Sequence, residues 1–103
     1  IRFNYSDIMT QNAEKDKIDP LEARRKRLRF RSWHRGTKEM DVLLGRFADA
    51  HIAGLSEDEI SQFERLLNNS DPDLYNWVSG YEPLPPAEDS TVMRRFLEFD
   101  LTK

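Results

Sequence analysis

The chain has 103 residues, a net charge of −3 at pH 7 and no cysteine. Its length allows one small domain, and the missing cysteines exclude a disulfide framework, a thiolate metal site and a cysteine nucleophile. No apolar run approaches the length of a membrane span and no secretory signal is evident, so we expect no membrane insertion.

The charge is unevenly distributed along the chain. Residues 15–38 carry ten Lys or Arg against three acids, whereas residues 39–93 carry twelve acids against two arginines. Residues 9–17 are polar and lack periodicity, and residues 1–8 precede a methionine and are left out of the fold prediction. We therefore expect residues 1–18 to form a flexible N-terminal tail and residues 19–103 to form the folded domain.

A first helix is predicted from Asp19 to about His34. Asp19 suits the N-cap, Pro20 the first helical position and Glu22 the reciprocal capping position. The helix is strongly basic, and Gly36 is placed to end it because glycine takes the left-handed conformation at low cost. Its apolar members are Leu21, Leu28, Phe30 and Trp33.

The second predicted helix has the clearest periodicity in the sequence. Gly45, within it, either permits a close backbone approach or is merely tolerated, at a cost of about 1 kcal/mol relative to alanine. His51 is predicted to be a packed histidine and not a ligand, and Gly54 marks the end. Alternating steps of three and one place on one face Met40, Leu43, Leu44, Phe47, Ala48, His51 and Ile52.

A third helix is predicted to begin after Ser56. Ser56 and Glu59 have the spacing of a capping box, and Leu55 and Ile60 that of a hydrophobic staple. The acids of this first turn are favoured by the helix dipole, so capping explains them better than metal binding or catalysis. The pair of asparagines at 68–69 ends this helix.

Two further helices are predicted in the last third of the chain. Asp71 as the cap and Pro72 as the first helical residue predict a short helix that ends at Gly80. Leu74, Trp77 and Val78 are predicted to face inward in it. Residues 82–86 hold three prolines and are expected to be extended. The last helix is predicted over about 90–100, with its inner face formed by Val92, Met93, Phe96 and Leu97.

The predicted fold class is all-α, a small five-helix bundle in a single domain, because no useful segment alternates with period two. The sequence has no phosphate-binding glycine loop. Its two histidines lack the spacing of a zinc helix motif, and no serine has the context of a nucleophile elbow. No catalytic or metal-binding residue is predicted, so the residues indicate a binding protein and not an enzyme.

The segment 31–41 stands out because a basic helix ends at a glycine and a second helix begins at once. This corner is predicted to bring Arg35, Lys38 and Glu39 close together, with Glu39 in a first turn that favours carboxylates. One interpretation is a simple helix–helix corner, in which Arg35 and Glu39 form a surface ion pair worth about 0–1 kcal/mol.

Two motifs in the sequence resemble those of a known family. Residues 35–39, Arg-Gly-Thr-Lys-Glu, resemble the RGxxE motif of the succinate dehydrogenase FAD assembly factors, which include succinate dehydrogenase assembly factor 2 and bacterial flavinylation factors. Residues 71–77 are similar to the second motif of that family, DPDLFNW, with Tyr75 in place of phenylalanine. The similarity covers about residues 24–99.

The resemblance implies an assembly factor that binds the flavoprotein subunit of succinate dehydrogenase or fumarate reductase. It would promote covalent attachment of FAD to a histidine of that subunit, and it would hold no tightly bound cofactor of its own. Glu39 would accept hydrogen bonds from the partner, and Arg31 and Arg35 would pair with its carboxylates. Leu74 and Trp77 are assigned to packing first. The partner-binding residues carried over are Arg31, His34, Arg35, Gly36, Lys38, Glu39, Asp73, Tyr75 and Asn76.

Two other functions remain open from the residues alone. The basic helix with Phe30 and Trp33 could bind a nucleic acid, although an isoelectric point of 5.4 argues against this. The chain could also be a generic helical interaction module with another client. We expect a monomer in the bacterial cytoplasm, or in the mitochondrial matrix if the source is eukaryotic.

Overall fold

The computed structural model describes residues 19–99, and within them the chain forms five α-helices and no strand, which confirms the predicted fold class. The flexible tail expected for residues 1–18 and the last predicted residues, 100–103, lie outside this range. Two short 3-10 turns, η1 (Ile52–Gly54) and η2 (Pro86–Glu88), join the helices. The helices are α2 (Pro20–Trp33), α3 (Lys38–His51), α4 (Glu57–Leu66), α5 (Asp71–Val78) and α6 (Thr91–Leu97).

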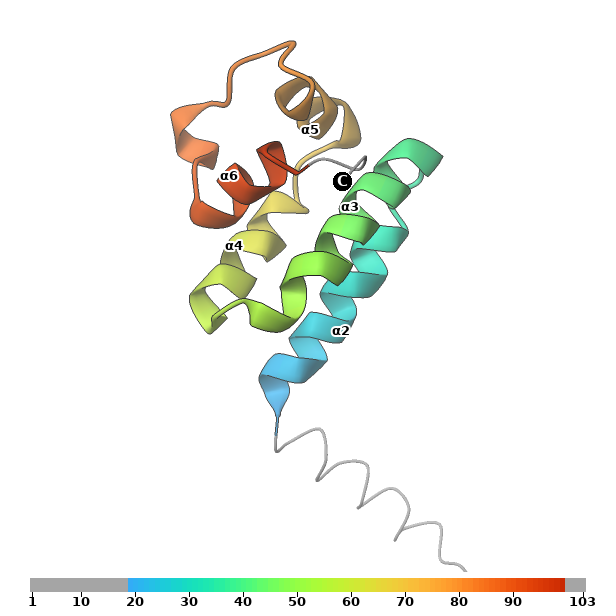
Figure 1. The fold of residues 1–103 in the computed structure, drawn as a ribbon, viewed down its shortest axis with the longest axis vertical. Helices are drawn as coiled ribbons and strands as arrows, with labels where there is room; N and C mark the ends of the chain where they lie inside the picture. The colour runs from blue at the N-terminus through green and yellow to red at the C-terminus, as the bar shows by residue number, and fades with distance from the viewer. Residues whose placement is uncertain (1–18, 100–103) are drawn as a thin grey trace, which may run out of the picture.

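Two layers of helices make up the bundle (Figure 1). The long helices α2 and α3 run side by side and pack against each other over most of their length. Helix α4 packs on α6 and also contacts α2. Helix α5 lies beyond the corner that joins α2 to α3, so two segments far apart in sequence meet at that end of the molecule.

Four of the five described helices begin at a side-chain cap, and α3, which begins after Thr37, does not. Asp19 accepts from the backbone N–H of Glu22 at 3.0 Å. Ser56 and Glu59 make both bonds of the predicted capping box, at 2.9 and 3.2 Å. For α5 the predicted cap was wrong by one residue, because Ser70 and not Asp71 accepts from the N–H of residue 73. This difference leaves the Asp71 carboxylate free for a contact with another part of the fold.

The last third of the chain departs from the prediction in two places. The extended segment predicted for residues 82–86 ends one residue early, because Pro86 begins the turn η2 and a proline is compatible with the first turn of a helix. Helix α6 begins after Ser90, as predicted, but ends at Leu97, earlier than the predicted end near residue 100.

Phe47 lies at the centre of the core. Its ring is fully buried, with the rings of Phe63, Phe96 and Phe99 each centred 5.5 Å away. His51, half-buried on the same helix, lies 4.8 Å from this ring and acts as a packed histidine, as predicted. The apolar positions of the third predicted helix, Ile60, Phe63, Leu66 and Leu67, are buried, as its helical periodicity predicts. Most of the other predicted inward residues are buried too: Leu28, Met40, Leu44, Phe47, Ala48, Ile52, Leu74, Val92, Met93 and Phe96.

Gly45 provides the close approach that the sequence left open. A Cβ atom built on it would lie 2.2 Å from the indole ring of Trp33, so the two long helices are spaced for a glycine.

We expect Gly45→Ala to lower the free energy of unfolding, because an overpacking cost of about 1–3 kcal/mol exceeds the gain in helix propensity of about 1 kcal/mol. In a Trp33→Leu background the same substitution should become neutral or stabilising. Urea denaturation of the four proteins tests this, and a Gly45→Ala protein more stable than the unaltered chain would contradict it.

Candidate functional site

The corner between α2 and α3 is a tight turn closed by a carboxylate. Gly36 has a φ of +115°, in the region that favours glycine. The backbone N–H groups of Arg35 and Gly36 both donate to the carboxylate of Asp41, the second at 3.2 Å. Sequence reasoning missed this role of Asp41, although its place in the first turn of α3 was a signal. These two hydrogen bonds to Asp41 therefore fix the backbone conformation of the turn.

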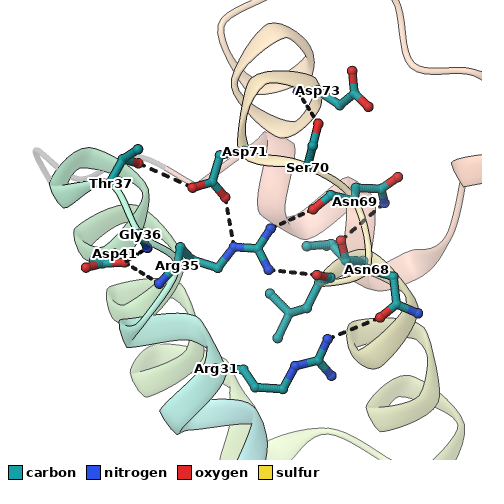
Figure 2. Close-up of polar contacts among 12 residues, drawn as sticks. Arg31, Arg35, Gly36, Thr37, Asp41, Asn68, Asn69, Ser70, Asp71 and Asp73 are labelled. Atoms are coloured by element: carbon teal, nitrogen blue, oxygen red, sulfur yellow. Dashed lines mark hydrogen bonds and ion pairs between the residues drawn. The ribbon is translucent and has the colours of Figure 1, made fainter.

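The side chain of Arg35 points into the fold (Figure 2). Its Nε atom donates to Asp71 at 2.8 Å, and its two terminal nitrogens donate to the carbonyl oxygens of Leu67 and Asn69 at 2.7 and 2.6 Å. The side chains of the ion pair are only 12% and 15% exposed. Thr37 donates to the other oxygen of Asp71 at 3.3 Å. Arg35 thus clamps the connection between α4 and α5 onto the corner.

The expected surface ion pair between Arg35 and Glu39 is not formed within the described residues, because Arg35 pairs with Asp71 instead. The guanidinium is a planar fork that donates to several oxygen acceptors at once. Three such acceptors lie within residues 67–71, at the end of α4 and the start of α5. Glu39 stays exposed in the first turn of α3. The arginine and the glutamate of one motif therefore lie in different surroundings.

Other arginines of α2 are also used inside the fold. Arg24 binds Glu64 at 2.7 Å and Ser61 at 3.0 Å, and Arg31 donates to Asn68 at 3.1 Å.

The Arg24 hydrogen bond lowers the pKa of Glu64. A carboxyl whose pKa is lowered on folding adds stability above its unfolded pKa, and that stability is lost on acidification through the folded pKa.

A spacing of seven residues places Arg24 and Arg31 on the same face of α2, which is the face whose side chains reach Glu64 and Asn68. Arg35 lies beyond the end of α2, so this periodicity gives no signal for its role.

The second motif divides between the core and the surface. Leu74 is buried, and Trp77 is partly buried against the core, as the packing assignment predicted. Asp73 is exposed, and the ring of Tyr75 is 51% exposed. Asn76 is half-buried and donates to Glu82 at 3.2 Å. Helix α5 therefore presents Asp73 and Tyr75 outward while Leu74 holds it in place.

The basic side of the corner remains open to solvent. His34 ends α2 with its ring stacked on Phe30, the two centroids 4.0 Å apart, and its Nδ1 atom lies 2.7 Å from the Phe30 carbonyl. Lys38 is exposed at the start of α3. Phe30 is 64% exposed, so this apolar member of the first helix is not a core residue.

A shallow hollow of about 370 Å³ lies where the first turns of α3 and α5 meet. The buried side chain of Met40 contributes to its lining, and the Tyr75 ring is exposed beside it. A larger cavity of about 520 Å³, at the end of α4, includes none of the corner residues. The hollow is lined by Thr37, Glu39, Met40, Asp71, Pro72 and Tyr75, so it joins the two sequence motifs.

Within residues 19–99, no group of three or more histidine, aspartate or glutamate side chains is arranged to hold a metal ion. None of the helices in that range is long and apolar enough to cross a bilayer.

Fold and corner together define a small helical interaction domain. The profile of a family described as "Flavinator of succinate dehydrogenase" matches residues 26–100, which is most of the chain. This chain belongs to that family. The matched range contains both motifs, the clamp and the hollow.

Relatives from a bacterium and from insects support this membership. The chain is 41% identical over 80 residues to "FAD assembly factor SdhE" of Acetobacter pasteurianus, covering 78% of this chain and 73% of that one. It is 37% identical over 78 residues to "Succinate dehydrogenase assembly factor 2-A, mitochondrial" of Drosophila yakuba, covering 74% and 48%. It is 33% identical over 82 residues to the 2-B protein of Drosophila melanogaster, covering 78% and 53%. The chain thus spans about half the length of these mitochondrial relatives.

Proposed function

We propose that this chain binds the flavoprotein subunit of succinate dehydrogenase or fumarate reductase and promotes covalent attachment of FAD to a histidine of that subunit. The observation that carries the proposal is the family match over residues 26–100, which contains the corner and α5. The relatives are named assembly factors and not enzymes, which supports a role as an accessory protein. The FAD and the acceptor histidine would both belong to the client.

The geometry supports a role in positioning. A corner that is hydrogen-bonded from within, by Asp41 and by the Arg35 clamp, loses little conformational entropy when it docks. Gly36, without a side chain, lets the client backbone approach the turn closely. Holding the flavin and the histidine of the client in a competent arrangement accelerates their reaction by proximity and orientation.

The exposed residues form the proposed contact surface. Glu39 accepts hydrogen bonds from the client, and the other exposed members are His34 and Lys38 at the corner and Asp73 and Tyr75 on α5. Asn76 is a peripheral member, since its amide already binds Glu82. For Arg31 and Arg35 the intramolecular bonds argue for a structural role in place of the expected pairing with client carboxylates.

We further propose that the chain works as a monomer, without a tightly bound cofactor of its own. Its site of action is the cytoplasm in a bacterium or the mitochondrial matrix in a eukaryote, in keeping with relatives of both origins. The guanidinium groups of Arg24 and Arg35 are paired with carboxylates inside the fold, which argues against their binding along a nucleic acid backbone, because phosphate contacts need free cations.

The experiment compares two matched glutamates in cells that lack the native factor and express the flavoprotein subunit. Glu39→Ala should reduce the rate of covalent flavin attachment at least roughly tenfold, since a charge-assisted hydrogen bond is worth about 1.5–3 kcal/mol. Glu57→Ala is the control, because Glu57 is also an exposed acid in the first turn of a helix. In-gel flavin fluorescence of the denatured subunit gives the readout. Equal covalent flavin with both variants would remove Glu39 from the proposed surface.

A further inference from the structure

Tyr75 is one of three large apolar side chains that stay exposed within the described residues, with Phe30 and Tyr81. Of these three, Tyr75 lines the hollow between α3 and α5. Burying such a side chain in a complex gives more binding energy than burying a polar one, and tyrosine is frequent among the residues that dominate interfaces. The hollow therefore has the character of a contact point.

The two carboxylates of the hollow differ in their partners. Asp71 is occupied by Arg35 and Thr37. Glu39 is exposed, and no hydrogen bond or ion pair joins its carboxylate to another group in residues 19–99. Lys38 is its neighbour in sequence, but side chains one residue apart on a helix do not face each other. A carboxylate without a hydrogen-bond or ion-pair partner in residues 19–99 thus lies at the edge of a largely apolar hollow that includes an aromatic ring.

We propose that this hollow receives the side chain of one arginine of the flavoprotein subunit, which deepens the proposed function and rests on it. The guanidinium binds the Glu39 carboxylate through a two-pronged hydrogen bond and stacks on the Tyr75 ring. Its methylene groups pack on Met40 and Pro72. Arginine fits better than lysine, because the guanidinium is planar, stacks on aromatic faces and is more weakly hydrated than an ammonium group.

The clamp explains why this site is ready before the client arrives. Asp71 is the first residue of α5, and its bonds to Arg35 and Thr37 hold that turn beside the first turn of α3. Glu39 lies in the first turn of α3, and Tyr75 lies one turn after Asp71 on α5, so the two side chains stay on opposite helices of one hollow. A preformed site avoids an ordering cost at binding.

The test measures binding of the whole chain to the purified flavoprotein subunit. Glu39→Gln removes the charge and keeps the shape of the side chain, and Tyr75→Ala removes the ring. Each substitution should raise the dissociation constant roughly tenfold or more. Tyr81→Ala is the control, because it removes another exposed ring, 80% exposed and outside the hollow. This control should bind within about twofold of the unaltered chain. Helical circular dichroism verifies that all three variants are folded.

Chemical modification identifies the occupant. An arginine-specific reagent such as phenylglyoxal, with sites mapped by mass spectrometry, should find one arginine of the subunit protected by the unaltered chain and exposed again with Tyr75→Ala. If the unaltered chain binds but Tyr75→Ala and Glu39→Gln bind equally well, or no arginine is protected, the arginine site is overturned and the proposed function stands. If the unaltered chain does not bind the subunit at all, the proposed function falls, and this site with it.

Discussion

Phe47→Ala is expected to cost about 3–5 kcal/mol of unfolding free energy. The ring has no solvent exposure and contacts aromatic rings from α4 and α6 and from Phe99, so its removal leaves a cavity that three elements border. A domain of this size has a total stability on the order of 5–15 kcal/mol. The substitution should therefore lower the melting temperature by on the order of 15 °C or more.

Thermal and urea unfolding, followed by helical circular dichroism, measure this effect. Phe30→Ala is the matched control, because it makes the same chemical change at a ring that is 64% exposed, and it should leave the melting temperature nearly unchanged. A Phe47→Ala protein as stable as Phe30→Ala would show that the core is not centred on Phe47.

Arg35→Met is expected to destabilise the domain by about 3 kcal/mol, because it removes one partner of an ion pair whose side chains are only 12% and 15% exposed. Asp71 would keep its charge without the guanidinium, and the carbonyl oxygens of Leu67 and Asn69 would lose their donors. Methionine keeps most of the length and apolar volume of arginine, so the loss reports the polar contacts more than a cavity. The stability of Arg35→Lys should lie between those of the unaltered chain and Arg35→Met, since an ammonium keeps the positive charge but cannot reproduce the fork of the guanidinium.

The control for Arg35→Met is Arg94→Met. Arg94 pairs with Asp89 at 2.7 Å but is 71% exposed, and a solvent-exposed pair of this kind contributes little. Urea denaturation should therefore show a clear loss for Arg35→Met and almost none for Arg94→Met. Equal stabilities would mean that the clamp does not hold α5 on the corner.

The helix pattern and most caps could be predicted from the sequence because they depend on near neighbours. The capping box at Ser56 and the apolar face of α3 involve residues within one or two turns of each other. The prediction for the start of α5 was wrong because two adjacent residues, Ser70 and Asp71, both suit an N-cap. Asp71 binds Arg35, which is 36 positions away in the sequence, so its carboxylate is engaged there and Ser70 caps the helix.

The same distance effect limits prediction of the site. The motif placed Arg35 and Glu39 together, and the corner exists, but the sequence does not tell which side chain faces inward. That depends on where the α4–α5 connection passes, and its acceptors are backbone oxygens of Leu67 and Asn69, which any residue type would offer. The hollow under Tyr75 depends on the same long-range arrangement.

The corner and the hollow, as we propose, serve the flavinylation of another protein. The most direct measurement mixes purified flavoprotein subunit that lacks covalent flavin with free FAD, with and without an equimolar amount of this chain. Covalent flavin is then read by fluorescence of the denatured subunit over time. Covalent flavin should rise faster with this chain than without it, and the rate should return toward the basal rate with Glu39→Ala. Identical time courses with and without the folded chain would contradict it.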